Sequence, residues 1–312
     1  MQRRGGTATR GKPTDNLVVS HWKPPRQKPL GKTRPIPTGI GNRVEQGEFI
    51  RSNPARIKAI ENLYATARQV FLRTFRSDKP AGRVGFYLGR ICVEEFSEIL
   101  LLAGNGHGIG ALKILRGMYE RAVTSAYILA NPDQAEAFLD YDKVNKHRAY
   151  MHAKKLGKYG PKLSPETIKR IEDDFEAVKP KFWTGKRVSA SWTRLDTASL
   201  AQKAGAGYEE LYLDAFFKPT LELHATAASV FGKLELRDKG IISFTSGPTR
   251  SKAAHAVIMA HNLLLRALDS QNTHFKLGLD ETLKKNVEDF EKAYAREETA
   301  ARSHADLPER PV

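Results

Sequence analysis

Cysteine is nearly absent from this chain, and long apolar runs are missing. The 312 residues include one cysteine, Cys92, which excludes an internal disulfide and any zinc site built on several cysteines. No stretch approaches the roughly 18 consecutive apolar residues of a membrane-spanning helix. The basic N-terminus also lacks the apolar core of a secretory signal. We therefore expect a cytoplasmic protein with no membrane segment.

Motifs for metals and phosphates are missing as well. The chain contains no Glu-x-x-His, no His-Glu-x-x-His and no phosphate-binding loop. His147 and His152 are five residues apart, about 140° around a helix, and so do not share a face. The glycine-rich stretch over residues 104–108 falls between two predicted helices rather than after a strand, which is typical of a turn. The sequence predicts no metal site and no bound cofactor.

Acidic residues are scarce in the N-terminal segment. The net charge of the chain is +16, and residues 1–44 alone carry ten Lys or Arg, one Asp and six Pro, which gives +9. This composition predicts a disordered basic arm over residues 1–48. Such an arm attracts phosphates and releases counterions, so we expect it to carry any nucleic-acid affinity; a solubilising tail is the alternative. The candidate contacts are Arg3, Arg4, Arg10, Lys12, Lys23, Arg26, Lys28, Lys32 and Arg34.

The rest of the chain shows apolar residues at helical spacing. Helices are predicted over about residues 53–71, 82–103, 109–130, 132–156, 165–179, 196–203, 208–232, 249–272 and 280–302. The helix over 208–232 is expected to kink at Pro219. The segment 241–248 is the only plausible strand. The predicted fold class is therefore all-α, a multi-helix bundle of about nine helices. This domain covers residues 49–303, and a disordered tail covers residues 304–312.

The predicted helix over 109–130 carries two charged residues beside its apolar stripe. With Leu112 at 0° on a helical wheel, Arg116 falls at about 40° and Glu120 at about 80°. Their i, i+4 spacing allows direct contact. A half-buried pair would form a preorganised polar site for an anion or for proton transfer, or a structural ion pair. If Glu120 is buried, removal of the Arg116 side chain should cost on the order of 3–5 kcal/mol.

A histidine occupies an apolar face of the predicted helix over 208–232. His224 shares that face with Leu213 and Phe217, where a histidine is usually a hydrogen-bonded core residue. It gains a catalytic meaning if the fold brings it to Arg116 and Glu120, because the three would supply a charge stabiliser and two acid/base groups. We expect the three side chains to converge inside the bundle.

Short motifs occur in a fixed order between about residues 86 and 234. They are Leu115-Arg116-Gly-Met-Tyr119-Glu120, Tyr127-Ile-Leu-Ala-Asn131-Pro132, Phe138-Leu-Asp140-Tyr141, Trp183-Thr-Gly-Lys and Leu223-His224-Ala225. In this order they resemble the bacterial family of unknown function DUF5677, over roughly half of the chain. The resemblance implies a helical fold, no settled activity, and Arg116, Glu120 and His224 as the positions to watch.

The leading interpretation is a helical-bundle protein that binds a polyanion or a protein partner, and a homodimer stays open. The alternative is a HEPN-like, metal-independent ribonuclease of the defence or toxin type. Arg250 and His255 have the Arg-x4–6-His spacing of that class, although Ser251 stands where it usually has Asn, Asp or His. Arg116, Glu120 and His224 form the catalytic set that we favour, because their stripe can exclude water. The sequence does not decide whether the protein is an enzyme.

Overall fold

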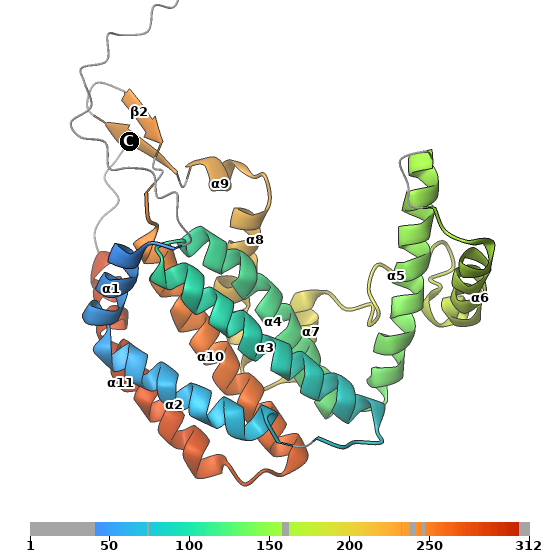
Figure 1. Cartoon of the computed structure of the whole chain (residues 1–312), viewed down its shortest axis with the longest axis horizontal. Coiled ribbons are helices and arrows are strands. Elements are labelled where there is room, and N and C mark those ends of the chain that lie inside the picture. The colour runs from blue at the N-terminus through green and yellow to red at the C-terminus, as the bar shows by residue number, and fades with distance from the viewer. Residues whose placement is uncertain are drawn as a thin grey trace, which may run out of the picture. The chain divides into compact units, whose positions relative to one another are not determined.

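The computed structural model describes residues 41–73, 75–157, 162–231, 233–237, 241–244 and 247–305 (Figure 1). Within these residues the chain forms eleven α-helices and one two-stranded hairpin. The all-α fold class is therefore confirmed. Most of the predicted basic arm, residues 1–40, and most of the predicted tail, residues 306–312, lie outside the described residues.

The helices follow one another through short connections. They are α1 (Arg43–Ser52), α2 (Pro54–Phe71), α3 (Pro80–Gly104), α4 (Gly108–Ala130), α5 (Gln134–Leu156), α6 (Pro165–Phe182), α7 (Thr197–Ala204), α8 (Lys218–Leu223), α9 (Ala227–Phe231), α10 (Arg250–Phe275) and α11 (Asp280–Ala305). A 3-10 helix, η2 (Tyr208–Leu211), and a π-helix, η3 (Tyr212–Phe217), join α7 to α8. Strands β1 (Leu234–Arg237) and β2 (Ile241–Phe244) pair antiparallel, with Leu234 opposite Phe244.

Helix α1 begins inside the segment that the sequence predicts to be a disordered arm. The Asn42 side chain caps it by accepting from the backbone N–H of Glu45. The Glu45 carboxylate accepts two hydrogen bonds of 3.0 Å from Arg250, at the start of α10. The Asn42 N–H donates to Asn105 at 2.6 Å. These partners are distant in the sequence, so local composition could not indicate the helix.

The segment 208–232, predicted as one long helix kinked at Pro219, is not a single helix: it is interrupted between α8 and α9. Pro219 has no N–H to donate to the carbonyl of Ala215, and the π-helix η3 precedes it. Farther along, the Thr226 hydroxyl caps α9 by accepting from the N–H of Ser229 at 3.2 Å. His224 lies between α8 and α9 with an extended backbone, φ −87° and ψ 159°. Together with α1, this division accounts for two helices more than predicted.

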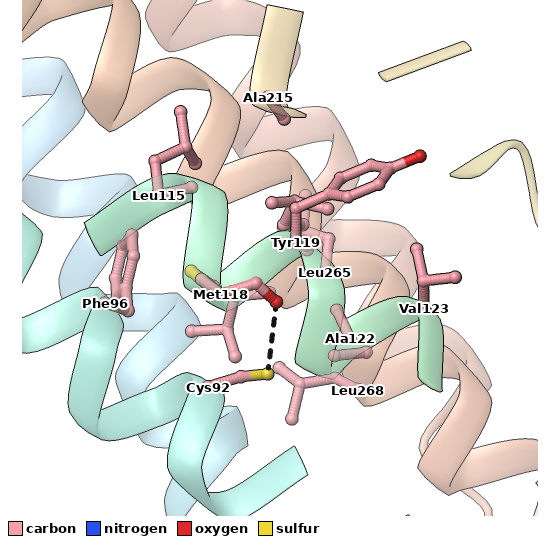
Figure 2. Close-up of a cluster of buried hydrophobic side chains, with 14 of the residues drawn as sticks. Cys92, Phe96, Leu115, Met118, Tyr119, Ala122, Val123, Ala215, Leu265 and Leu268 are labelled. Carbon is pink, nitrogen blue, oxygen red and sulfur yellow. Dashed lines mark hydrogen bonds between the residues drawn. The ribbon is translucent and has the colours of Figure 1, made fainter. Parts of the chain in front are cut away.

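Helices α3, α4 and α10 pack against one another, and α2 packs against α11 (Figure 1). The apolar core lies among them and includes the fully buried Phe96, Leu115 and Leu268. Figure 2 shows this cluster with the Cys92 thiol donating to the carbonyl of Met118 at 3.8 Å. Burial raises the pKa of Cys92, which keeps the thiol protonated and unreactive. No described helix has both the length and the apolar character needed to cross a membrane.

A second, smaller apolar cluster holds α5 against α6. Its buried members are Tyr141, Val144, Phe175, Val178 and Phe182. His147 stacks on Phe175, with ring centroids 3.8 Å apart. The half-buried Trp192, in the segment before α7, packs against both this cluster and the main core.

The start of α4 touches the backbone of α10. A Cβ at Gly108 would clash with the carbonyl oxygen of Thr249 and the amide of Ala253. The Thr249 N–H donates to the Gly106 carbonyl at 2.9 Å, and the Thr249 hydroxyl accepts from Ile109 at 3.3 Å. This contact needs a residue without a side chain.

We expect Gly108→Ala to destabilise the protein by about 1–3 kcal/mol, because the α10 backbone has little freedom to move away. Gly104→Ala is the matched control, since a Cβ at Gly104 would meet only Phe49 at 3.8 Å, an ordinary contact. Urea unfolding of the two variants and the wild type measures the difference. If both variants unfold with the same free energy, α4 and α10 can move apart at position 108 without loss of stability.

The core also contains a fully buried histidine. His261, on α10, lies among Phe96, Phe290 and Tyr294, and its Nδ1 is 3.4 Å from the Tyr294 hydroxyl. Its Nε2 has no hydrogen-bond partner within the described residues. Burial lowers the pKa of His261 to about 3, so the ring is neutral and packs as part of the apolar core.

The contribution of His261 to stability should therefore fall as the pH is lowered from about 6.5 towards 3. In that range the unfolded chain binds a proton at His261 and the folded chain does not, which costs up to about 1.4 kcal/mol per pH unit. His261→Leu should remove this part of the pH dependence. The exposed His152 provides the control, His152→Leu, which should retain it. Unfolding free energies measured at several pH values distinguish the variants.

Candidate functional site

The predicted contact between Arg116 and Glu120 is present on α4. Arg116 donates from Nη1 to Oε2 at 2.9 Å and from Nη2 to Oε1 at 3.2 Å. This two-pronged arrangement fixes the orientation of both side chains. The Arg116 side chain is 24% exposed and that of Glu120 is 41% exposed. The pair is therefore half-buried, as expected, but it lies at the edge of the bundle rather than inside it.

Two further residues hold Arg116 in place. Its Nε donates to the Thr220 hydroxyl at 3.1 Å, and its guanidinium carbon is 4.9 Å from the centre of the Phe216 ring. Three of the five N–H donors of an arginine are thus used by Glu120 and Thr220. Sequence reasoning missed Phe216 and Thr220, although their i, i+4 spacing on a predicted helix places them on one face. The site joins α4 to η3 and α8.

His224 does not take part in these contacts within the described residues. Its side chain is exposed, beyond the end of α8, and its backbone N–H donates to the Thr220 carbonyl at 3.2 Å. Helix α8 thus brings Thr220, one turn earlier, against Arg116. The convergence of three side chains inside the bundle is not seen, because His224 is exposed. A catalytic role for Arg116, Glu120 and His224 stays a prediction.

Arg250 and His255 bind to different elements. The Arg250 guanidinium binds Glu45 and Glu48 of α1 at 3.0 and 2.8 Å. His255 Nε2 is 3.0 Å from the Asp214 carbonyl of η3. The ribonuclease-like spacing therefore does not bring the two side chains to a shared partner.

Sequence reasoning missed a second charged pair, which joins α4 to α3. Arg121 donates to Glu95 of α3 at 2.5 Å, and Gly117 leaves the space for both, because a Cβ there would be 2.8 Å from the Arg121 guanidinium. Burial raises the pKa of Glu95 to about 7; Arg121 lowers it, but the charges of Glu98 and Glu120 add to the rise. Across the described residues, no three His, Cys, Asp or Glu side chains gather to hold a metal ion.

A basic stretch covers the second half of α5 and continues beyond that helix in the sequence. Residues 143–163, the basic run, include seven Lys or Arg and no acid. Lys154, Lys155 and Lys162 are exposed and form no ion pair within the described residues. A cleft of about 670 Å³ opens between α5 and α6. The absence of acids from this run was visible in the sequence and could have indicated a basic surface. Sequence reasoning considered only the larger charge of the N-terminal arm.

Comparison with known proteins places these features in a family. A family model described as "Family of unknown function (DUF5677)" matches residues 83–241, half of the chain. The chain belongs to the DUF5677 family. The match includes the Arg116–Glu120 pair, Thr220, His224 and the whole α5–α6 hairpin, whereas residues 1–40, α10 and α11 lie outside it. No curated protein and no solved structure matches this chain.

We expect the Arg116–Glu120 pair of this DUF5677 protein to have a coupling energy of about 1 kcal/mol or less, because water reaches both side chains. This is below the cost anticipated for a buried pair. A double-mutant cycle with Arg116→Leu and Glu120→Gln, measured by urea unfolding, gives the value. The exposed pair Lys58–Glu61, 3.5 Å apart, is the reference cycle. Coupling above about 3 kcal/mol would mean that the pair is closed to water.

Proposed function

We propose that this DUF5677 protein binds nucleic acid, with the α5–α6 hairpin as a docking surface for phosphates. The observation that carries the proposal is the basic run, where seven positive side chains follow one another without an acid. Polyanions bind such surfaces by displacing condensed counterions, with little demand on sequence. The exposed lysines at the end of α5 can reach phosphates without breaking an ion pair within the described residues.

The exposed ion pairs at this surface would compete only weakly with a bound phosphate for the lysine side chains. Lys146 pairs with Asp142 at 2.6 Å, but both side chains are more than half exposed. Exposed pairs of this kind contribute about 0–1 kcal/mol, so a phosphate can replace the aspartate. Asp140, by contrast, is bound by Lys143 and Lys181, and these contacts lower the pKa of Asp140. Lys181, on α6, thereby links α6 to α5, whereas the contact of Lys143 lies within α5.

The basic N-terminal arm adds a second source of attraction. Its nine candidate residues, from Arg3 to Arg34, lie in the same chain as the hairpin, and two linked binding segments raise the affinity for one polyanion. The arm lies outside the family match, whereas the hairpin lies within it. The hairpin is therefore the part of this activity that other family members are proposed to share.

The ribonuclease alternative has less support. An acid/base mechanism needs side chains that converge on one reacting group. Arg250 is held by two carboxylates of α1, and His255 contacts η3. The Arg116 site offers a carboxylate and a guanidinium, but its predicted histidine is exposed beyond α8.

Replacing both Lys154 and Lys155 with Ala should weaken binding to RNA and DNA by several-fold at low salt. The salt dependence should also become shallower, by a slope of about 0.7 for every single-strand phosphate that the protein no longer neutralises. Fluorescence anisotropy of labelled oligonucleotides at several salt concentrations measures both effects. The full chain is used, so the arm is retained.

The matched control replaces Lys284 and Lys285 with Ala. These two adjacent lysines lie on α11, outside the hairpin, and their removal changes the net charge equally. If the two double variants bind alike, attraction is due to overall charge and the hairpin has no dedicated role. If the wild type shows no affinity at low salt, the proposed function is wrong.

A further inference from the structure

The cleft between α5 and α6 has the size and chemistry of a small-ligand site. Its volume of about 670 Å³ lies within the roughly 300–1,000 Å³ that such sites occupy. Apolar side chains, including Leu163 and Ile171, line part of it. Lys146 from α5 and Arg170 from α6 also line it. The cleft therefore combines an apolar surface with positive charge.

An aromatic ring borders the same cleft. Tyr150 is half-buried on α5. The Lys154 amine is 5.9 Å from the centre of its ring, and the His147 ring centroid is 6.3 Å away. The Tyr150 hydroxyl makes no hydrogen bond within the described residues. Tyr150 thus offers a flat apolar surface next to cationic side chains.

The cations of the cleft are available to a ligand. Arg170 is exposed and has no ion pair in the described part of the chain. Lys146 is held only by an exposed aspartate. Asp174 is the single acid among the described side chains that border the cleft. The balance favours an anion there.

We infer that the α5–α6 cleft binds an unpaired nucleotide of single-stranded RNA or DNA, with its base stacked on Tyr150 and its phosphate held by Arg170 and Lys146. This inference rests on the proposed function and names its substrate class. In a duplex the base faces are stacked inside, and exposing one requires unpairing. In a single strand they are free, and stacking on an aromatic side chain tolerates any sequence.

The test compares Tyr150→Leu with Tyr150→Phe in the full chain. Leucine fills space but cannot stack with a base, whereas phenylalanine keeps the ring. The probes are oligo(dU), oligo(rU) and a duplex, each of about 12 nucleotides per strand, within the range of known site sizes. Tyr87→Leu is the matched control, because Tyr87 is 58% exposed on α3, outside the hairpin. Thermal unfolding checks that each variant is folded.

We expect Tyr150→Leu to weaken single-strand binding by about tenfold and to change duplex binding by less than about twofold. Tyr150→Phe and Tyr87→Leu should bind as the wild type does. Weaker binding to only one of the two single strands would also support the inference and identify the preferred sugar. If the wild type binds the probes and Tyr150→Leu binds the single strands equally well, the inference alone is overturned. If the wild type binds none of the probes, the proposed function fails with it.

Discussion

The enclosure of α4 is the constraint on which much of this structure depends. Helix α4 packs against α3 and α10, and also against α7, η3 and α8. Most of its residues are buried, so its charged side chains, apart from the exposed Lys113, emerge at the seams between helices. At these seams Arg116 meets Glu120 and Thr220, and Arg121 meets Glu95. The polar contacts of α4 are thus a consequence of its confinement, since an unpaired charge at such a seam would be costly.

Features that depend on neighbouring residues could be predicted from the sequence. Helices α2 and α6 begin at Pro54 and Pro165, the second capped by Ser164, and these signals act within one turn. The Arg116–Glu120 contact was predictable for the same reason, because both residues lie on one helix. The start of α1 was not, since it depends on Arg250 and Asn105, far along the chain. A kink at Pro219 was predictable, whereas the break of the 208–232 segment at residues 224–226, where Thr226 caps α9, was not.

The candidate site also depends on packing between elements, which local sequence patterns do not determine. Spacing on a wheel gives the direction of a side chain, but not which element will cover it. Phe216 and Thr220 cover Arg116 because η3 and α8 pack on α4, and no local pattern determines that packing. His224 was placed inside the bundle by extending a helix that ends one residue earlier. The charge of the hairpin was visible in the sequence, whereas its cleft required α6 to be placed beside α5.

The separate apolar cluster of the α5–α6 hairpin has a consequence for its motions. Five buried residues hold these two helices together, far fewer than the residues that form the main core. Such a unit can open by itself, at a lower free energy than global unfolding. Its amide hydrogens should then exchange with solvent sooner than those of α3, α4 and α10. Trp192, which touches both clusters, is positioned to report through its fluorescence when one cluster opens and the other remains closed.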